Sequence, residues 1–262
     1  MARNTVVREP EVVSSSEEFE RFSLVFRIQH IVLFTSCIVL MITGLPLRFP
    51  NTGWAAVFFN LTGGVAASGL IHRVGAVGLI GVGVFHMIYI TLMRDGRHNF
   101  RELIPRFHDV KDVFKNVWYF LGRSKTGAPF GRFSYIEKFD YWAVYWGMVV
   151  MIASGLMLWF QDKTMSILPK VFIDVAREAH SDEALLATLA IIIWHFYNVH
   201  FSPDHFPMSW TWLTGKISHE KMIHHHPLEY EQIVAEREKS TGGNGREHSS
   251  SEAGEHIEVV EH

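Results

Sequence analysis

Two histidines stand at opposite ends of an uncharged apolar stretch in the last third of the chain. His180 precedes this stretch and His195 follows it, while the residues from Ala184 to Trp194 carry no charge. In a helix, this spacing places the two imidazoles about 22 Å apart and within about 60° of one face. Ionisable side chains at membrane depth are costly and usually serve a function. Because imidazole is a common ligand of haem iron, we interpret the pair as ligands of two stacked haems.

Three further histidines could complete these sites. His72 and His86 lie fourteen positions apart in a second apolar stretch, and His30 lies at the start of the first. Antiparallel neighbouring helices would put His72 at the depth of His180, as an outer pair. The inner haem would take two of His30, His86 and His195, and periodicity alone favours His86 with His195. The spacing does not decide between these pairings.

The elements that position these histidines are four apolar stretches, each long enough to cross a bilayer as a helix. They cover residues 24–47, 70–92, 141–160 and 180–203. We therefore predict an all-α membrane protein with a four-helix bundle over residues 21–235. Residues 1–20 form a polar tail that lacks a secretory signal, and residues 236–262 are a predicted disordered tail.

The segments between the stretches suggest the orientation. Residues 94–132 are rich in Lys and Arg, whereas the two predicted outer loops, 48–69 and 161–179, hold few, so both termini are expected in the cytoplasm. Apolar residues at helical spacing between 110 and 121 predict an amphipathic helix at the lipid interface, and 48–69 suits a second one. The expected location is the inner (cytoplasmic) membrane, in contact with lipid.

Composition limits the kinds of cofactor. The 262 residues include a single cysteine, Cys37, which excludes an internal disulfide, a cysteine-only iron–sulfur cluster and covalent haem attachment through C-x-x-C-H. Any haem is therefore b-type. The formal net charge of −3 gives no support to nucleic-acid binding. Arg48 and Arg73 near the outer haem and Arg27 near the inner one are candidate partners for haem propionates, with interfacial snorkelling as the alternative.

Glycines accompany the histidines in the first two stretches. Gly44 lies fourteen positions after His30, and Gly75, Gly78, Gly81 and Gly83 lie between His72 and His86. Small residues in membrane helices permit close helix contact. The alternatives for these glycines are clearance for a flat porphyrin and, for Gly44, a helix end before Pro46.

The chain contains an ordered set of short motifs within residues 21–235. They are R-I-Q-H at 27–30 with T-G at 43–44, I-H-R at 71–73, K-F-D-Y-W at 138–142 with S-G at 154–155, the two-histidine fourth stretch, and H-H-P at 225–227. This ordered set resembles the cytochrome b subunit of respiratory formate dehydrogenases, and it is similar also to the corresponding subunits of nickel–iron hydrogenases and thiosulfate reductases.

The resemblance implies a di-haem protein with ligands on the first, second and fourth helices. It pairs His30 with His195 for the inner haem and His72 with His180 for the outer one. The fourth-helix histidines are fifteen apart here, against fourteen in the family's formate dehydrogenase members, so a bulge or an altered ring angle is required. His86 has no family counterpart. It could replace His30, hydrogen-bond a propionate or quinone, or join His200 at a third haem.

The resemblance further implies a quinone pocket beside the inner haem, where this chain has Ser134, Glu137, Lys138 and Asp140. Glu137 and Asp140 could exchange protons there, or could simply form a charged helix start. The expected function is an electron-transfer subunit of a quinone-linked respiratory oxidoreductase complex. Its partner would be an iron–sulfur protein, a dehydrogenase or hydrogenase, or a multihaem cytochrome c, with quinone or menaquinone as substrate. The alternatives are a stand-alone ferric-reductase-like cytochrome b and a non-haem four-helix transporter.

Overall fold

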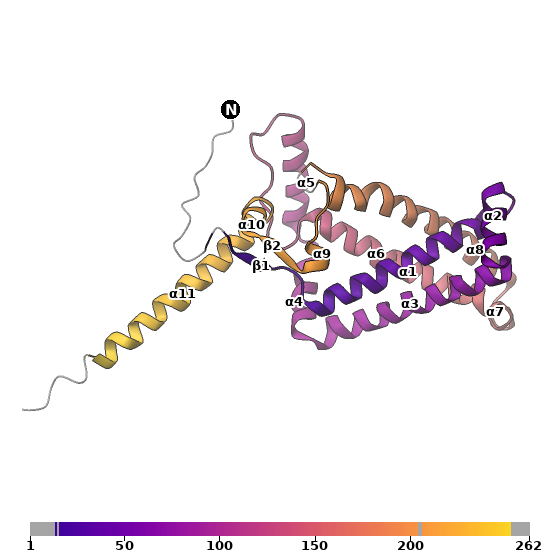
Figure 1. Cartoon of the computed structure of the whole chain (residues 1–262), viewed down its shortest axis with the longest axis horizontal. Coiled ribbons are helices and arrows are strands. Elements are labelled where there is room, and N and C mark those ends of the chain that lie inside the picture. The colour runs from indigo at the N-terminus through magenta and orange to yellow at the C-terminus, as the bar shows by residue number, and fades with distance from the viewer. Residues whose placement is uncertain (1–13, 15, 204–205, 253–262) are drawn as a thin grey trace, which may run out of the picture. The chain divides into compact units, whose positions relative to one another are not determined.

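Four long helices dominate the fold (Figure 1). The computed structural model describes residues 14, 16–203 and 206–252. The long helices are α1 (Leu24–Arg48), α3 (Val65–Leu92), α6 (Tyr135–Trp159) and α8 (Lys170–Leu189), which continues as the π-helices η1 (Ala190–His195) and η2 (Tyr197–Phe201). All four are long and apolar enough to span a membrane. The prediction of an all-α membrane bundle with four spans is therefore confirmed.

The fourth long helix begins ten residues earlier than expected. Residues 161–179, which we predicted to be a loop, form α7 (Gln161–Ile167) and the first part of α8. After Pro169 the sequence K-V-F-I-D-V-A-R-E-A contains no glycine or proline that would interrupt a helix. From Lys170 to Phe201 the helix is about 48 Å long, which exceeds the hydrocarbon thickness of about 30 Å. Its charged first turns can therefore lie outside the hydrocarbon.

The burial pattern of these helices is the reverse of that in a water-soluble bundle. Between 6 and 22% of each apolar window is buried inside the protein. Many buried positions are instead polar, including Gln29, Ser36 and Thr43 on α1, Ser154 on α6 and Thr188 on α8. Apolar side chains that face outward and polar side chains that face inward suit a bundle surrounded by lipid.

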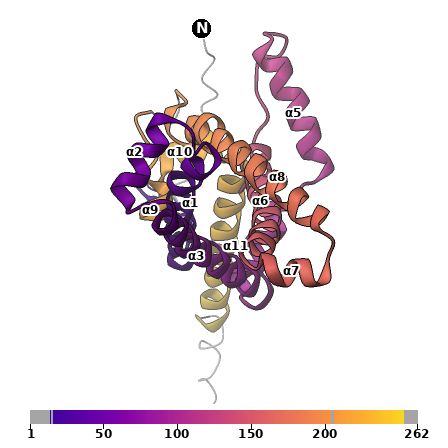
Figure 2. The same cartoon turned by 90° about the vertical axis from the view of Figure 1, so that its right-hand side faces the viewer.

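The long helices associate as two pairs. Helix α1 packs mainly against α3, and α6 packs mainly against α8, as the end-on view shows (Figure 2). Gly75 and Gly78 make the first pairing close, since a Cβ at Gly75 would lie 3.0 Å from Val39 and one at Gly78 would lie 2.5 Å from the Ser36 hydroxyl. Helix contact thus accounts for these two glycines. An added Cβ at Gly81 would meet nothing within 4 Å.

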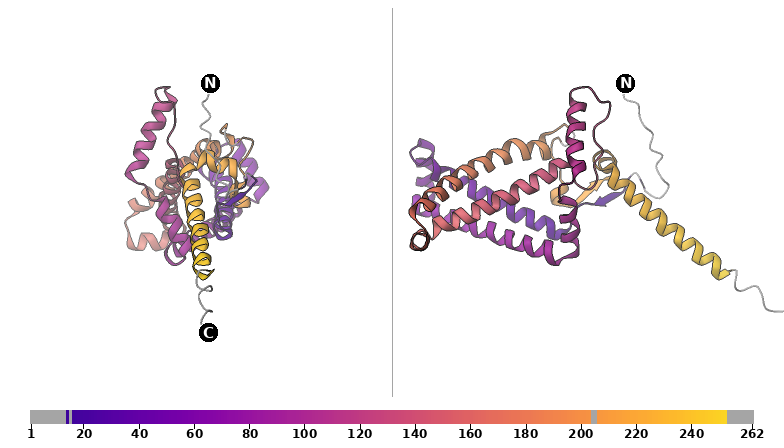
Figure 3. Two further views of the ribbon diagram at one scale, coloured as in Figure 1. Left: turned by 90° about the vertical axis from the view of Figure 1, so that its left-hand side faces the viewer. Right: turned by 180° about the vertical axis from the view of Figure 1, so that it is seen from behind.

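Short helices lie at the two ends of this four-helix unit (Figure 3). Helices α2 (Gly53–Thr62) and α7 lie at one end, and α4 (Arg94–Leu103) and α9 (Thr211–Thr214) at the other. Gly63 and Gly64 have φ angles of 89° and 104°, which allows the chain to reverse sharply between α2 and α3. The short helix predicted within residues 48–69 is present as α2.

Among the described residues, a second compact unit contains residues 14, 16–20, 106–134 and 216–252, and the first contains 21–105, 135–203 and 206–215. In the second unit, β1 (Glu18–Glu20) pairs antiparallel with β2 (Lys216–Ser218). Its helices are α5 (Phe107–Phe120), α10 (His219–His225) and α11 (Pro227–Glu252). The sequence analysis predicts one domain over residues 21–235 and a disordered tail over residues 236–262. The structure has α11 as far as Glu252, and residues 253–262 lie outside the described part.

A small apolar core holds this second unit together. Phe19, Ile217, Met222 and Tyr230 are each less than a tenth exposed and pack as one cluster. His226 of the H-H-P motif is bonded through Nδ1 to the Gly131 carbonyl at 2.8 Å. This histidine therefore ties the segment after α5 to the start of α11.

Candidate haem sites

His72 on α3 and His180 on α8 face each other across the two helix pairs. Their ring centroids are 6.3 Å apart and the ring planes are inclined by 71°. A metal–imidazole bond is about 2 Å long, so two imidazoles on opposite sides of one metal have their ligating nitrogens about 4 Å apart. Each centroid lies roughly a ring radius farther out. The observed spacing therefore fits two axial ligands of one metal.

A hydroxyl group lies against Nδ1 of each of these two rings. Thr43 Oγ1 is 2.9 Å from His72 Nδ1, and Ser154 Oγ is 3.0 Å from His180 Nδ1. Each hydroxyl also lies 2.6 Å from the backbone carbonyl four residues earlier in its own helix, to which it donates its single proton. Nδ1 must then donate to the hydroxyl, which leaves the Nε2 lone pair of both neutral imidazoles for a metal.

A glycine follows each of these hydroxyl residues and makes room for the ring. A Cβ at Gly44 would lie 3.2 Å from His72 Cε1, and a Cβ at Gly155 would lie 3.0 Å from His180 Cε1. Gly44 lies inside α1, which continues to Arg48, so it does not end the helix. The space at Gly44 and Gly155 accommodates the candidate ligands.

His195 at the end of η1 contacts a carboxylate. Its Nδ1 is 3.1 Å from Asp140 Oδ2, and Trp194 Nε1 donates to Asp140 Oδ1 at 2.6 Å. Both oxygens of Asp140 thus accept from N–H groups. The carboxylate fixes Nδ1 as the protonated nitrogen of His195, which leaves Nε2 for a metal, as in carboxylate–histidine–metal arrangements.

His30 on α1 has a different environment. Its ring lies 5.7 Å from that of Trp212, and its buried Nδ1 has no hydrogen-bond partner among the described residues. A buried polar atom without a partner costs about 1–3 kcal/mol, which a group bound at this site would offset. The residues on this side of the bundle therefore fit a ligand-binding role.

His86 uses both of its ring nitrogens within the protein. Nδ1 is 2.9 Å from Gln29 Oε1 and Nε2 is 2.9 Å from the Tyr141 hydroxyl. Because the amide oxygen can only accept, Nδ1 is the donor and Nε2 accepts from Tyr141. This histidine links α1, α3 and α6, and its Nε2 lone pair is already engaged.

The π-helical segment explains how His195 can sit fifteen positions after His180. In a continuous α-helix, one extra residue would rotate the His195 side chain by about 100° around the helix axis. A π-helical turn, with i→i+5 hydrogen bonds, contains more residues than an α-helical turn and can therefore accommodate the extra residue without this rotation. Segment η1 covers Ala190–His195 and lies directly between the two histidines. Of the two possibilities that the resemblance left open, a bulge or an altered ring angle, the structure contains a π-helical bulge.

The three candidate propionate partners have partners within the protein. Arg27 Nη1 donates to the carbonyls of Leu213 and Thr214 at 2.7 and 2.8 Å. Arg48 joins α1 to α8 through Ser181 and through Asp182, the latter at 2.8 Å. The exposed Arg73 guanidinium lies 5.5 Å from the centre of the Trp159 ring. Arg48 is linked to the region of His180 through Asp182, which follows His180 by two residues, and Arg73 directly follows His72.

The residues expected at the quinone pocket have separate environments. Ser134 is buried just before α6 and Lys138 is buried within it. Glu137 forms an ion pair of 3.3 Å with the buried Arg21 and keeps 39% of its side chain exposed. Asp140 contacts His195 and Trp194, as described above. The structure thus brings Asp140 to the candidate haem ligand, whereas Glu137 is paired with Arg21.

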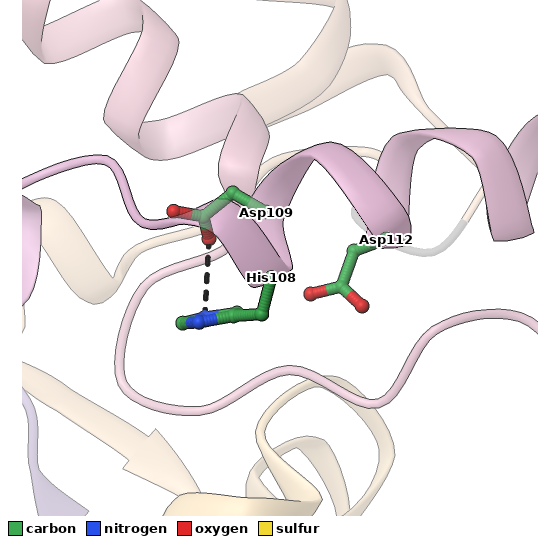
Figure 4. Close-up of side chains that lie close together, drawn as sticks. All are labelled: His108, Asp109 and Asp112. Carbon is green, nitrogen blue, oxygen red and sulfur yellow. Dashed lines mark ion pairs between the residues drawn. The ribbon is translucent and has the colours of Figure 1, made fainter.

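One other group of metal-ligand side chains occurs among the described residues, at the start of α5 (Figure 4). It consists of His108, Asp109 and Asp112. Asp109 Oδ2 accepts from the Arg106 backbone N–H at 2.6 Å, and Oδ1 lies 3.3 Å from His108 Nε2. A carboxylate that satisfies a free N–H at a helix start stabilises that helix. This cluster is therefore explained as the cap of α5.

Comparison with known proteins identifies the family. A family model described as prokaryotic cytochrome b561 matches residues 21–204, which is more than half of the chain. The chain belongs to this family. It is therefore a membrane b-type cytochrome that takes part in electron transfer, with haem b as its cofactor.

Individual relatives of this cytochrome b561 support the same classification. The chain is 25% identical over 225 residues to the cytochrome b556(fdo) subunit of formate dehydrogenase from Escherichia coli K12. The alignment covers 84% of this chain and 95% of the relative. The same subunits from strains O6:H1 and O157:H7 match equally. The resemblance to a respiratory cytochrome b subunit is confirmed.

Five residues that contact the candidate ligands were not predicted as site residues from the sequence, although four of them lie in the motifs that carry the resemblance. They are Gln29, Thr43, Tyr141, Ser154 and Trp194. One regularity could have indicated some of them, because Gln29 precedes Thr43 and Asp140 precedes Ser154 by the same fourteen positions. This spacing equals that between His72 and His86.

Proposed function

We propose that this cytochrome is the membrane subunit of a quinone-linked oxidoreductase complex and relays electrons between a redox partner subunit and quinone through two haems b. The observation that carries the proposal is the opposition of His72 and His180. Their rings are spaced for one metal, and both have Nδ1 committed to a hydroxyl. Haem b, when bound, supplies reversible one-electron chemistry at such sites.

The outer site would be held by His72 and His180, and the inner site by His30 and His195. Three arguments favour this assignment for the inner site. His195 has its Nε2 left open by Asp140, and His30 has an unsatisfied buried nitrogen. His86 has both nitrogens engaged by Gln29 and Tyr141, so it acts as a link between helices.

The partner subunit is proposed to be a dehydrogenase component with its own redox centres. The support is the similarity to the cytochrome subunit of formate dehydrogenase over 95% of that relative. Quinone would react beside the inner site at the start of α6. There the partly exposed Glu137 is the side chain suited to exchange protons with water, because its carboxylate is paired yet reachable.

The proposed orientation puts both termini in the cytoplasm. The segment between α3 and α6 carries Arg94, Arg97, Arg101, Arg106, Lys111, Lys115, Arg123 and Lys125. Positive charge near span ends is retained on the cytoplasmic side. The inner site then lies near the cytoplasmic face and the outer site near the opposite face.

The test is the reduced-minus-oxidised visible spectrum of the purified chain, with haem quantified per chain. We expect two b-type haems. The substitution His72→Ala or His180→Ala should remove one, and His30→Ala or His195→Ala should remove the other. His86→Ala should remove none. Absence of a haem band would overturn the proposal and favour the transporter alternative. Two haems without reduction of a quinone analogue would favour the ferric-reductase alternative.

A further inference from the structure

The two helix pairs repeat one arrangement of polar contacts. In the pair α1 and α3, Thr43 holds His72 and Gln29 holds His86. In the pair α6 and α8, Ser154 holds His180 and Asp140 holds His195. Each contact joins a side chain on the first helix of the pair to Nδ1 of a histidine on the second.

One of the four contacts differs from the others in the charge of its acceptor. Three of the four Nδ1 acceptors are neutral: two hydroxyls and the Gln29 amide oxygen. The fourth is the Asp140 carboxylate, whose two oxygens both accept from N–H groups. Its side chain is 20% exposed, and that of His195 is 35% exposed, so water screens the interaction only in part.

We infer that Asp140 is a positioning residue that also sets the reduction potential of the inner haem below that of the outer one. The inference rests on the proposed function, in which His195 is an inner ligand. A carboxylate that accepts from Nδ1–H makes the imidazole a stronger electron donor through Nε2. Stronger donation stabilises the ferric state relative to the ferrous state. A hydroxyl acceptor, as at His72 and His180, has no net charge and exerts this effect weakly.

Trp194 is the second element of this arrangement. Its indole N–H donates to Oδ1 at 2.6 Å, which keeps the carboxylate oriented with Oδ2 toward His195. The simple substitution Asp140→Asn is therefore ambiguous, because an amide offers only one acceptor oxygen to two N–H donors. The double substitution Asp140→Asn with Trp194→Phe removes the competing donor. The amide oxygen can then accept from His195 without a charge.

The experiment is a spectroscopically monitored redox titration of the purified full chain. In the wild type we expect two midpoint potentials. In the double variant the lower potential should rise while haem content and the higher potential stay unchanged. We expect about a tenfold change in the ferrous-to-ferric ratio at fixed ambient potential, which for a one-electron couple is about 59 mV. Trp194→Phe alone, which keeps the carboxylate, should move the lower potential much less.

A matched variant separates this effect from a general disturbance. Gln29→Glu introduces a carboxylate at the equivalent position of the first pair, against His86 rather than a proposed ligand. It should leave both potentials unchanged. A fall of the lower potential in Gln29→Glu would instead make His86 the inner ligand and overturn the assignment to Asp140 and His195.

The failure of the inference is distinguishable from the failure of the proposed function. A wild-type chain that holds two haems, with both potentials unchanged in the double variant, overturns the role of Asp140 alone. A chain without haem overturns the proposed function itself. Restoration of the wild-type lower potential by Asp140→Glu, which keeps the charge, would support the inference. A rise of that potential in Asp140→Glu as large as in the double variant would contradict it.

Discussion

Gly155 on α6 lies so close to His180 on α8 that a Cβ at this position would be 3.0 Å from the imidazole Cε1. The substitution Gly155→Ala should therefore push the ring away from His72 and remove one haem while the other remains. Haem per chain and the visible spectrum measure this. Gly81→Ala is the matched control on α3, because a Cβ there would meet nothing within 4 Å. If Gly155→Ala retains both haems, the ring has room that the structure does not show.

The hydroxyls at the outer site should contribute to haem affinity without binding the metal. Thr43→Val keeps the shape of the side chain and removes the acceptor for His72 Nδ1. Loss of such a partner typically lowers metal affinity by roughly 10–100-fold, and we expect a decrease in this range for the outer haem. Titration of haem into the haem-depleted protein measures it. Thr188→Val is the control, since the buried Thr188 hydroxyl bonds to Ala184 of its own helix at 2.7 Å. Equal effects of the two substitutions would contradict the prediction.

His86 should matter for stability and not for haem content. His86→Leu leaves Gln29 and Tyr141 without the partner that each has at 2.9 Å. An unpaired buried polar group costs about 1–3 kcal/mol, so the midpoint of thermal unfolding should fall while the haem content per chain stays that of the wild type. Detergent-solubilised protein followed by circular dichroism provides the measurement. The double variant His86→Leu with Tyr141→Phe, which removes one orphaned hydroxyl, should recover part of the loss.

The π-helical segment should tolerate a deletion that an α-helix does not. Removing the exposed Ile192 shortens the spacing of His180 and His195 from fifteen to fourteen residues, and η1 can then become α-helical. We expect both haems to be retained. Deletion of the exposed Val144 in α6, which is α-helical throughout, rotates Asp140 relative to Ser154 by about 100° and should abolish haem binding. Haem content of both variants, read with the circular dichroism spectrum, decides the prediction.

The second unit should respond to acid through one ion pair. Arg237 donates to both oxygens of Glu17, at 2.6 and 3.0 Å, and this hydrogen bonding lowers the pKa of Glu17 from its ordinary value of 4.5. The stabilisation is therefore complete above pH 4.5 and is lost as the pH falls through the lowered pKa. Because both side chains are partly exposed, we expect no more than about 1 kcal/mol.

Limited proteolysis at several pH values measures the contribution of the Glu17–Arg237 ion pair to stability. The variant Glu17→Gln should make residues around β1 more susceptible to protease at neutral pH and should differ less from the wild type in acid. Glu18→Gln is the control, because Glu18 and Lys216 form a more exposed pair at 3.1 Å. The prediction is contradicted if the two variants behave alike.

The span positions could be predicted because the length of an apolar run is set by bilayer thickness. The histidines could be found because ionisable residues are rare within such runs. Thr43 and Ser154 could not be assigned, since a hydroxyl in a membrane helix commonly bonds only to its own backbone, as Thr188 does here. Strand β1 pairs with β2 from the far end of the chain, and each has three residues, which is too short for an alternating pattern to be recognised.

The division of the long helices into two antiparallel pairs also has a consequence for biogenesis. Each pair is a helical hairpin that can leave the insertion machinery with its glycine contacts, its outer histidine and the hydroxyl for that histidine already in place. Neither hairpin alone presents two opposed imidazoles, because His72 belongs to one and His180 to the other. With the outer haem held by His72 and His180 as proposed, its binding would have to wait until both halves of the chain are in the membrane, and the haem would then link the two hairpins.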